Sequence, residues 1–149
     1  MFADVELEAG DKAHDLAALG LRVQRKAKMT AFAQPCSCFA GKWCKIYRDR
    51  PARCRAFECG TLKRVQAAQL SPTQALSLIG QAQRQVKEIR NQLRQLGNNE
   101  EHLPLSRRYA RVMAQPLDLA GDEGIVEMRA QLMLNVDALM KLIQRQFLH

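Results

Sequence analysis

The chain has 149 residues, the length of one ordinary domain, and its 47% apolar and 26% charged residues exclude wholesale disorder. No apolar run approaches the roughly 20 residues that a membrane-spanning helix needs, and the first ten residues are acidic, unlike a secretory leader, so we expect a cytoplasmic protein without a membrane partner. The formal net charge of +8 is concentrated in residues 22–64, which hold twelve basic and two acidic side chains.

The first third of the chain predicts short elements. Residues 5–7 form an extended lead, and a helix follows that starts near Gly10 or Asp11 and ends at Gly20. Weak apolar alternation over residues 21–35 favours one or two strands. The cysteine region that comes next is punctuated by turn-forming residues, which predict loops with at most short turns of helix. These residues are Pro35, Gly41, Pro51 and Gly60.

The second half predicts three helices. Residues 71–74, Ser-Pro-Thr-Gln, supply an N-cap, a proline at the first helical position and a glutamine that can complete a capping box. The long helix that begins there ends at Gly97-Asn98-Asn99. A short helix follows residue 104 and stops near Pro116. Asp122 is placed to cap the last helix.

Apolar residues recur every three or four positions along both long helices, which predicts an antiparallel hairpin with the two stripes packed together. A homodimer or a protein partner held through the same stripe is the competing arrangement. We expect these residues to be buried together: Ile79, Val86, Ile89, Leu93, Leu132, Val136, Leu139 and Ile143. The expected fold is mostly α. It has an N-terminal helix and loop-rich cysteine-cluster module at residues 1–66, followed by the antiparallel helical hairpin at residues 67–149, packed as one unit.

The five cysteines form the clearest functional pattern, because all of them fall within residues 36–59. In a reducing compartment, clustered thiols more often bind metal than form disulfides. Thiolates suit zinc, iron or an iron–sulfur cluster, and interleaved basic side chains such as Arg50 and Arg55 can offset their charge. The candidate metal ligands are Cys36, Cys38, Cys44, Cys54 and Cys59.

The same region carries a longer motif, Cys-x-Ile-Tyr-x2-Arg-Pro-x2-Cys-Arg-x-Phe-x-Cys, at residues 44–59. With Gln34-Pro35-Cys36 before it, this string resembles the C-terminal half of the signature of the YkgJ-like family of zinc- or iron-chelating cysteine-cluster proteins. The resemblance spans about residues 2–62 and implies metal chelation rather than a reaction. It favours Cys36 as a ligand and makes Cys38 supernumerary. Members begin with a Cys-x2-Cys-x2-Cys-Cys segment, so we expect the reading frame upstream of Met1 to encode one.

Two other functions remain as alternatives. The basic segment is typical of a nucleic-acid-binding protein. The aromatic residues available there for a stacking surface, Trp43, Tyr47 and Phe57, are few, and we expect Tyr47 and Phe57 to pack in the core around the cysteine loop. We therefore expect weak and nonspecific nucleic-acid binding at most. A redox or iron–sulfur protein is the second alternative. The sequence contains no Ser/His/Asp arrangement, glycine-rich phosphate loop or paired catalytic carboxylates that would indicate an enzyme.

Overall fold

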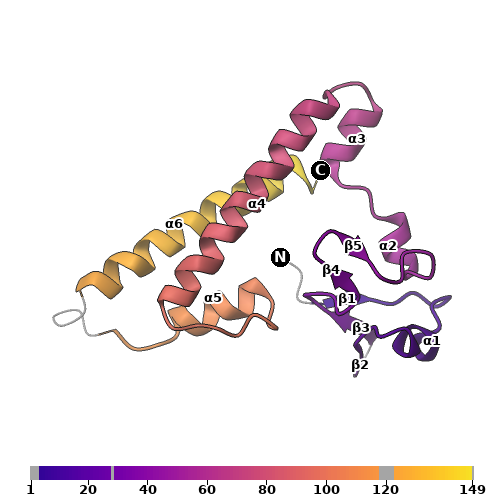
Figure 1. The fold of residues 1–149 in the computed structure, drawn as a ribbon, viewed down its shortest axis with the longest axis horizontal. Coiled ribbons are helices and arrows are strands. Elements are labelled where there is room, and N and C mark those ends of the chain that lie inside the picture. Colours follow the sequence, from indigo (N-terminus) through magenta and orange to yellow (C-terminus); the bar gives the residue numbers. More distant parts are fainter. Residues whose placement is uncertain (1–3, 28, 118–122, 149) are drawn as a thin grey trace. The chain divides into compact units, whose positions relative to one another are not determined.

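The computed structural model describes residues 4–27, 29–117 and 123–148, and the chain divides into two compact units (Figure 1). The cysteine unit comprises residues 1–57 together with residues 100–107. The helical unit comprises residues 58–99 and 108–149. Four of the five cysteines therefore belong to the cysteine unit, and Cys59 belongs to the helical unit.

The cysteine unit is built on two small antiparallel sheets. The first sheet has the strand order β1-β3-β2, and Val5 of β1 and Val23 of β2 both pair with Phe32 of the central strand. The second sheet is the β4-β5 hairpin, in which Gly41 adopts a φ of 64° in the connecting turn. The elements are β1 (Asp4–Glu6), α1 (Ala13–Ala18), β2 (Val23–Lys26), β3 (Met29–Ala33), β4 (Phe39–Ala40), β5 (Trp43–Cys44) and α2 (Ala52–Ala56).

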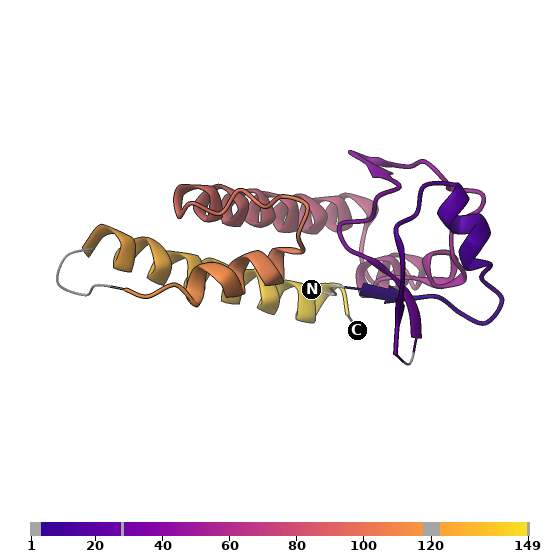
Figure 2. The same ribbon diagram turned by 90° about the horizontal axis from the view of Figure 1, so that it is seen from below.

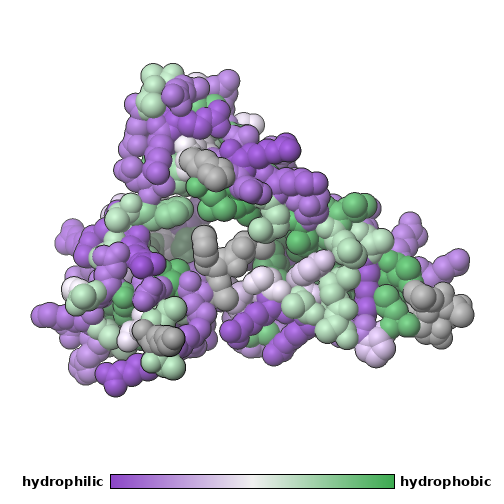
Figure 3. Space-filling model, turned by 180° about the vertical axis from the view of Figure 1, so that it is seen from behind, coloured by the Kyte–Doolittle hydropathy of each residue, from purple (hydrophilic) through white to green (hydrophobic). Residues whose placement is uncertain are grey.

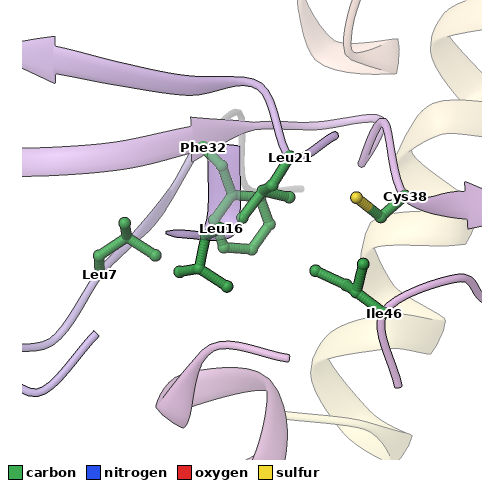
Figure 4. Close-up of a cluster of buried hydrophobic side chains, with 6 residues drawn as sticks. All are labelled: Leu7, Leu16, Leu21, Phe32, Cys38 and Ile46. Carbon is green, nitrogen blue, oxygen red and sulfur yellow. The ribbon is translucent and has the colours of Figure 1, made fainter. Parts of the chain in front are cut away.

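The core of this unit is small and includes one of the thiols. Its buried members come from β3, from α1 and from loops, and Figure 4 shows the Cys38 side chain at one end of the group, beside Leu21 and Ile46. Three further cysteines pack against the core while remaining half-buried. The six buried residues are Leu7, Leu16, Leu21, Phe32, Cys38 and Ile46.

The prediction of a mostly α fold with a loop-rich cysteine module is wrong, because this unit contains both sheets. The extended lead at residues 5–7 and the strands expected within residues 21–35 are present, but they are joined into one sheet. The β4-β5 hairpin lies where only loops and turns of helix were expected. Its strands are two residues long, so apolar alternation had no length over which to appear.

The helical unit follows the sequence prediction more closely. The Ser71 hydroxyl oxygen accepts a hydrogen bond from the Gln74 backbone amide, and the Gln74 side-chain oxygen accepts one from the Ser71 backbone amide, so the predicted capping box is confirmed. Figures 1 and 2 show α4 and α6 packed side by side and running in opposite directions. The first turn of α5 is grouped with the cysteine unit. The elements are α3 (Gly60–Gln66), α4 (Pro72–Gln95), α5 (Leu105–Met113) and α6 (Glu123–Gln146). The predicted cap Asp122 lies outside the described residues.

Burial along the two long helices confirms most of the predicted stripe. Four of its eight residues, Ile89, Leu93, Leu132 and Leu139, are 0% exposed, as is Val112 of α5. Three more are half-buried: Val86, Val136 and Ile143. The remaining member, Ile79, is 37% exposed, so its expected burial is wrong. The fully buried members of the stripe on α4 therefore lie near the end of that helix, and the exposed member lies in its first third.

The helical unit also carries apolar side chains on its surface. Met133, Leu134 and Met140 of α6 are exposed, and hydrophobic residues lie among hydrophilic ones on the face drawn in Figure 3.

Among the described residues, no helix combines the length and the apolar character that crossing a membrane requires.

Candidate metal centre

The four cysteines of the cysteine unit lie at two depths. Cys38 is 1% exposed, and its Sγ lies 3.9 Å from the Leu19 carbonyl oxygen, to which the thiol donates. Its backbone carbonyl accepts a hydrogen bond from the Lys45 amide at 2.9 Å. Cys38 thus packs as a core residue at the base of the β4-β5 hairpin, whereas Cys36, Cys44 and Cys54 are half-buried around that core.

The hairpin brings two of the half-buried cysteines to the same part of the unit. Phe39 pairs with Cys44 across the hairpin, and the Phe39 amide donates to the Cys36 carbonyl at 3.1 Å. A tight turn before β4 and the hairpin itself therefore fold the chain back so that Cys36 and Cys44, eight positions apart, both face the small core.

Asp11 fixes the helix that carries the third half-buried cysteine. One of its carboxylate oxygens accepts from the Ala52 amide at 2.9 Å, in the first turn of α2, and the other accepts from the Glu8 amide at 3.0 Å. The sequence suggested Asp11 as the start of α1, but the N-cap of α1 is Lys12. Asp11 instead ties the loop before α1 to the start of α2, where Cys54 lies.

Two of the three half-buried thiols, Cys36 and Cys54, have raised pKa values. Burial is the largest cause that raises the pKa of Cys36, and negative charge on Cys38 and Cys44 raises it further. Burial also raises the pKa of Cys54, followed by the charges of Cys36 and Cys44. Cys44 thus acts on both Cys36 and Cys54, and in the absence of a metal the raised pKa values favour the protonated forms of Cys36 and Cys54.

Arg50 is a positively charged neighbour of the half-buried thiols. Its positive charge lowers the pKa of Cys54, against the larger effect of burial. Its guanidinium carbon lies 4.1 Å from the centre of the Tyr47 ring, and its Nε is buried without a hydrogen-bond partner among the described residues. Arg55 donates to the Arg50 carbonyl at 2.7 Å, so it supports the loop rather than a thiol. The ion pairs of Arg53 are made with acidic residues on and after β1.

The aromatic residues of the motif do not pack as the sequence suggested. Tyr47 and Phe57 were expected to fill the core around the cysteine loop, yet they are 62% and 65% exposed, so this expectation is wrong. Trp43 is 77% exposed on the hairpin. None of the three covers the half-buried thiols from solvent as a core residue would.

The donor types fit a soft metal ion, but the side chains are not arranged around a common point. Within residues 4–27, 29–117 and 123–148, no three His, Cys, Asp or Glu side chains form a group able to hold an ion as they stand. Cys59 precedes α3 in the other unit, and its carbonyl accepts from the Lys63 amide at 3.1 Å. Its predicted role as a ligand stays a prediction.

No family model, curated protein or solved structure matches this chain. The YkgJ-like resemblance therefore remains a prediction based on the motif at residues 44–59. Sequence reasoning missed the bridging role of Asp11, which joins segments 41 positions apart. An aspartate just before a predicted helix normally indicates the cap of that helix. Asp11 precedes α1, but it accepts a hydrogen bond from the first turn of α2 instead.

Proposed function

We propose that the cysteine unit binds one zinc or iron ion through the thiolates of Cys36, Cys44 and Cys54, and that the protein has a structural or metal-handling role. Three thiolates are a suitable partial set for a soft tetrahedral ion. Cys38 remains a packing thiol in this proposal. The ion would supply a point to which all three sulfurs bind, and Arg50 would offset part of their negative charge.

The observation that carries the proposal is that the three half-buried thiols pack against one small core, where the charges of Cys36 and Cys44 both help to raise the pKa of Cys54. They come from three separate segments: the loop before β4, the strand β5 and the helix α2. Free cysteines that serve only as small apolar side chains are usually among the most buried residues, whereas these three remain half-exposed.

The size of the core gives a physical reason for such a site. Among the described residues of the cysteine unit, six form the buried cluster, and one of them carries a thiol. Small cores yield little stability, and natural small domains often add a metal ion for this reason. Because an ion bound to the folded state adds its binding free energy to folding, it would stabilise a unit whose own core is limited.

The test is metal content and stability after single substitutions. The full chain is purified anaerobically with zinc or ferrous iron, and bound metal is measured by mass spectrometry of the element. We expect Cys36→Ser, Cys44→Ser and Cys54→Ser each to lower the metal content sharply and to abolish the rise in melting temperature that metal causes.

Cys38→Ala is the matched control, because it removes a thiol from the same unit without touching the proposed ligands. It should lower stability through lost packing while leaving the metal content near that of the unchanged chain. Equal metal loss in all four variants would contradict the assignment of ligands, and absence of metal from the unchanged chain after loading would refute the proposed function.

A further inference from the structure

A buried arginine in the helical unit lies beside a cavity. Arg129 of α6 is 5% exposed. Its Nη1 donates to the Gln115 backbone carbonyl at 2.8 Å, and its Nη2 donates to the Gln115 side-chain oxygen at 3.3 Å. Both acceptors are uncharged. Arginine is permanently charged, and a buried charge is stable only when it is paired or fully hydrogen-bonded.

The hydrogen bonding of Arg129 is incomplete. Its Nε is buried and has no partner among the described residues, and no carboxylate in that part of the chain forms an ion pair with it. Arg108, the other buried arginine of this unit, uses its Nε and Nη2 to donate to Asn98 at 2.9 and 2.7 Å. The Nε of Arg129 therefore lacks an acceptor among the described residues, whereas the Nε of Arg108 has one.

The cavity has the composition of a small-molecule site. Its volume is about 200 Å³. The described residues that line it include one cation, two amides and four apolar side chains, contributed by the end of α4, the segment after α5 and the first turns of α6. They are Gln95, Leu96, Gln115, Pro116, Ile125, Met128 and Arg129. A wall that combines apolar side chains with a few fixed polar groups is typical of pockets for small organic ligands.

We infer that this cavity binds a small organic monocarboxylate with a short apolar tail. The carboxylate accepts charge-assisted hydrogen bonds from the Arg129 guanidinium, and the tail contacts Leu96, Ile125 and Met128. The described lining holds a single cation, which matches one negative charge and leaves the second charge of a phosphate unpaired. The apolar wall favours an organic anion over an inorganic one, because burying the tail adds hydrophobic free energy.

The experiment titrates the full chain with sodium isovalerate at constant ionic strength and follows amide chemical shifts by NMR. Isovaleramide, which has the same shape without the charge, and inorganic phosphate are titrated in parallel. We expect isovalerate to shift the amides of Leu96 and Ile125 in a saturable way. Isovaleramide and phosphate should bind at least about tenfold more weakly, the factor that loss of one charged hydrogen bond gives.

Arg129→Gln removes the charge, and Arg90→Gln is the matched control on an exposed arginine of α4. Isovalerate binding should weaken at least about tenfold in the first variant and stay unchanged in the second. If Arg129→Gln does not fold, Ile125→Trp provides the test, since it fills the cavity and keeps the arginine; it should also abolish binding. Equal binding of isovaleramide, tighter binding of phosphate, unchanged binding in either cavity variant, or no saturable shift in the unchanged chain would each overturn the inference.

Discussion

Leu93 offers the sharpest test of how the helical unit is held together. It is 0% exposed on the face of α4 that packs against α6. Replacing it with alanine removes three buried carbon atoms, worth about 0.8 kcal/mol each in transfer free energy. The cavity that remains adds a further cost, so Leu93→Ala should lower the free energy of unfolding by about 3–5 kcal/mol.

Urea denaturation followed by the helical circular dichroism signal measures this loss. Leu76→Ala is the matched control, because Leu76 lies on the same helix and is 67% exposed. The control should change the free energy of unfolding by no more than about 0.5 kcal/mol. If the two variants unfold at the same urea concentration, the packing of α4 against α6 does not stabilise the unit and the reasoning is refuted.

Three further predictions concern caps and thiols. Ser71→Ala should destabilise the helical unit by roughly 0.5–2 kcal/mol in the same urea assay, because it removes the N-cap of α4, and an unchanged midpoint would count against the cap. Asp11→Ala should lower the melting temperature of the metal-free chain, since two backbone amides lose their acceptor, whereas Asp15→Ala, at an exposed aspartate of α1, should not. Burial raises the pKa of Cys36 and Cys54 above the usual 9.0. Their protonated forms therefore stabilise the folded metal-free chain fully below pH 9.0, and this contribution disappears as pH rises through the raised pKa values. Alkylation by iodoacetamide should accordingly require more alkaline pH in the folded chain than in urea, and identical pH profiles would contradict the shift.

The helical unit was predictable because its determinants are local. The capping box at Ser71 and Gln74 involves residues three positions apart. At the other end of α4, Gly97 adopts a φ of 82°, and the Asn98 amide donates to the Leu93 carbonyl at 2.8 Å. This arrangement ends helices and favours glycine at that position. The spacing of apolar residues then identified which side of α4 and α6 is buried.

The cysteine unit was predicted less well because its determinants join distant segments. The central strand β3 pairs with β1, more than twenty residues earlier, through Val5 and Phe32. The alternation within each strand is weak, since only Ala31 and Phe32 of β3 are fully buried. Strand preference depends on such cross-strand neighbours, which the sequence does not reveal.

The candidate site, too, was predicted only in part from the sequence. Clustering within residues 36–59 identified the cysteines as a group, but spacing alone did not separate the core thiol Cys38 from its half-buried neighbours. The motif resemblance favoured Cys36 over Cys38 as a metal ligand. In the structure Cys36 is half-buried and Cys38 is buried. Arg50 was one of several interleaved basic residues in the sequence, and its position beside Tyr47 and near Cys54 required the fold.

In the helical unit, carbonyls at or shortly after the ends of three helices accept hydrogen bonds from other helices. The last carbonyls of a helix lack partners within it and carry partial negative charge, so cationic and hydroxyl donors are favourable there. Arg108 of α5 binds Asn98 just after α4, and Arg129 of α6 binds Gln115 just after α5. At the end of α6, the Thr61 hydroxyl of α3 donates to the Gln146 carbonyl at 2.6 Å. Each of these hydrogen bonds joins the region at the end of one helix to the side or start of another. They connect the helices in addition to the packing of their apolar residues. Arg129 differs from the other two donors because its Nε has no acceptor in the part of the chain that the structure describes.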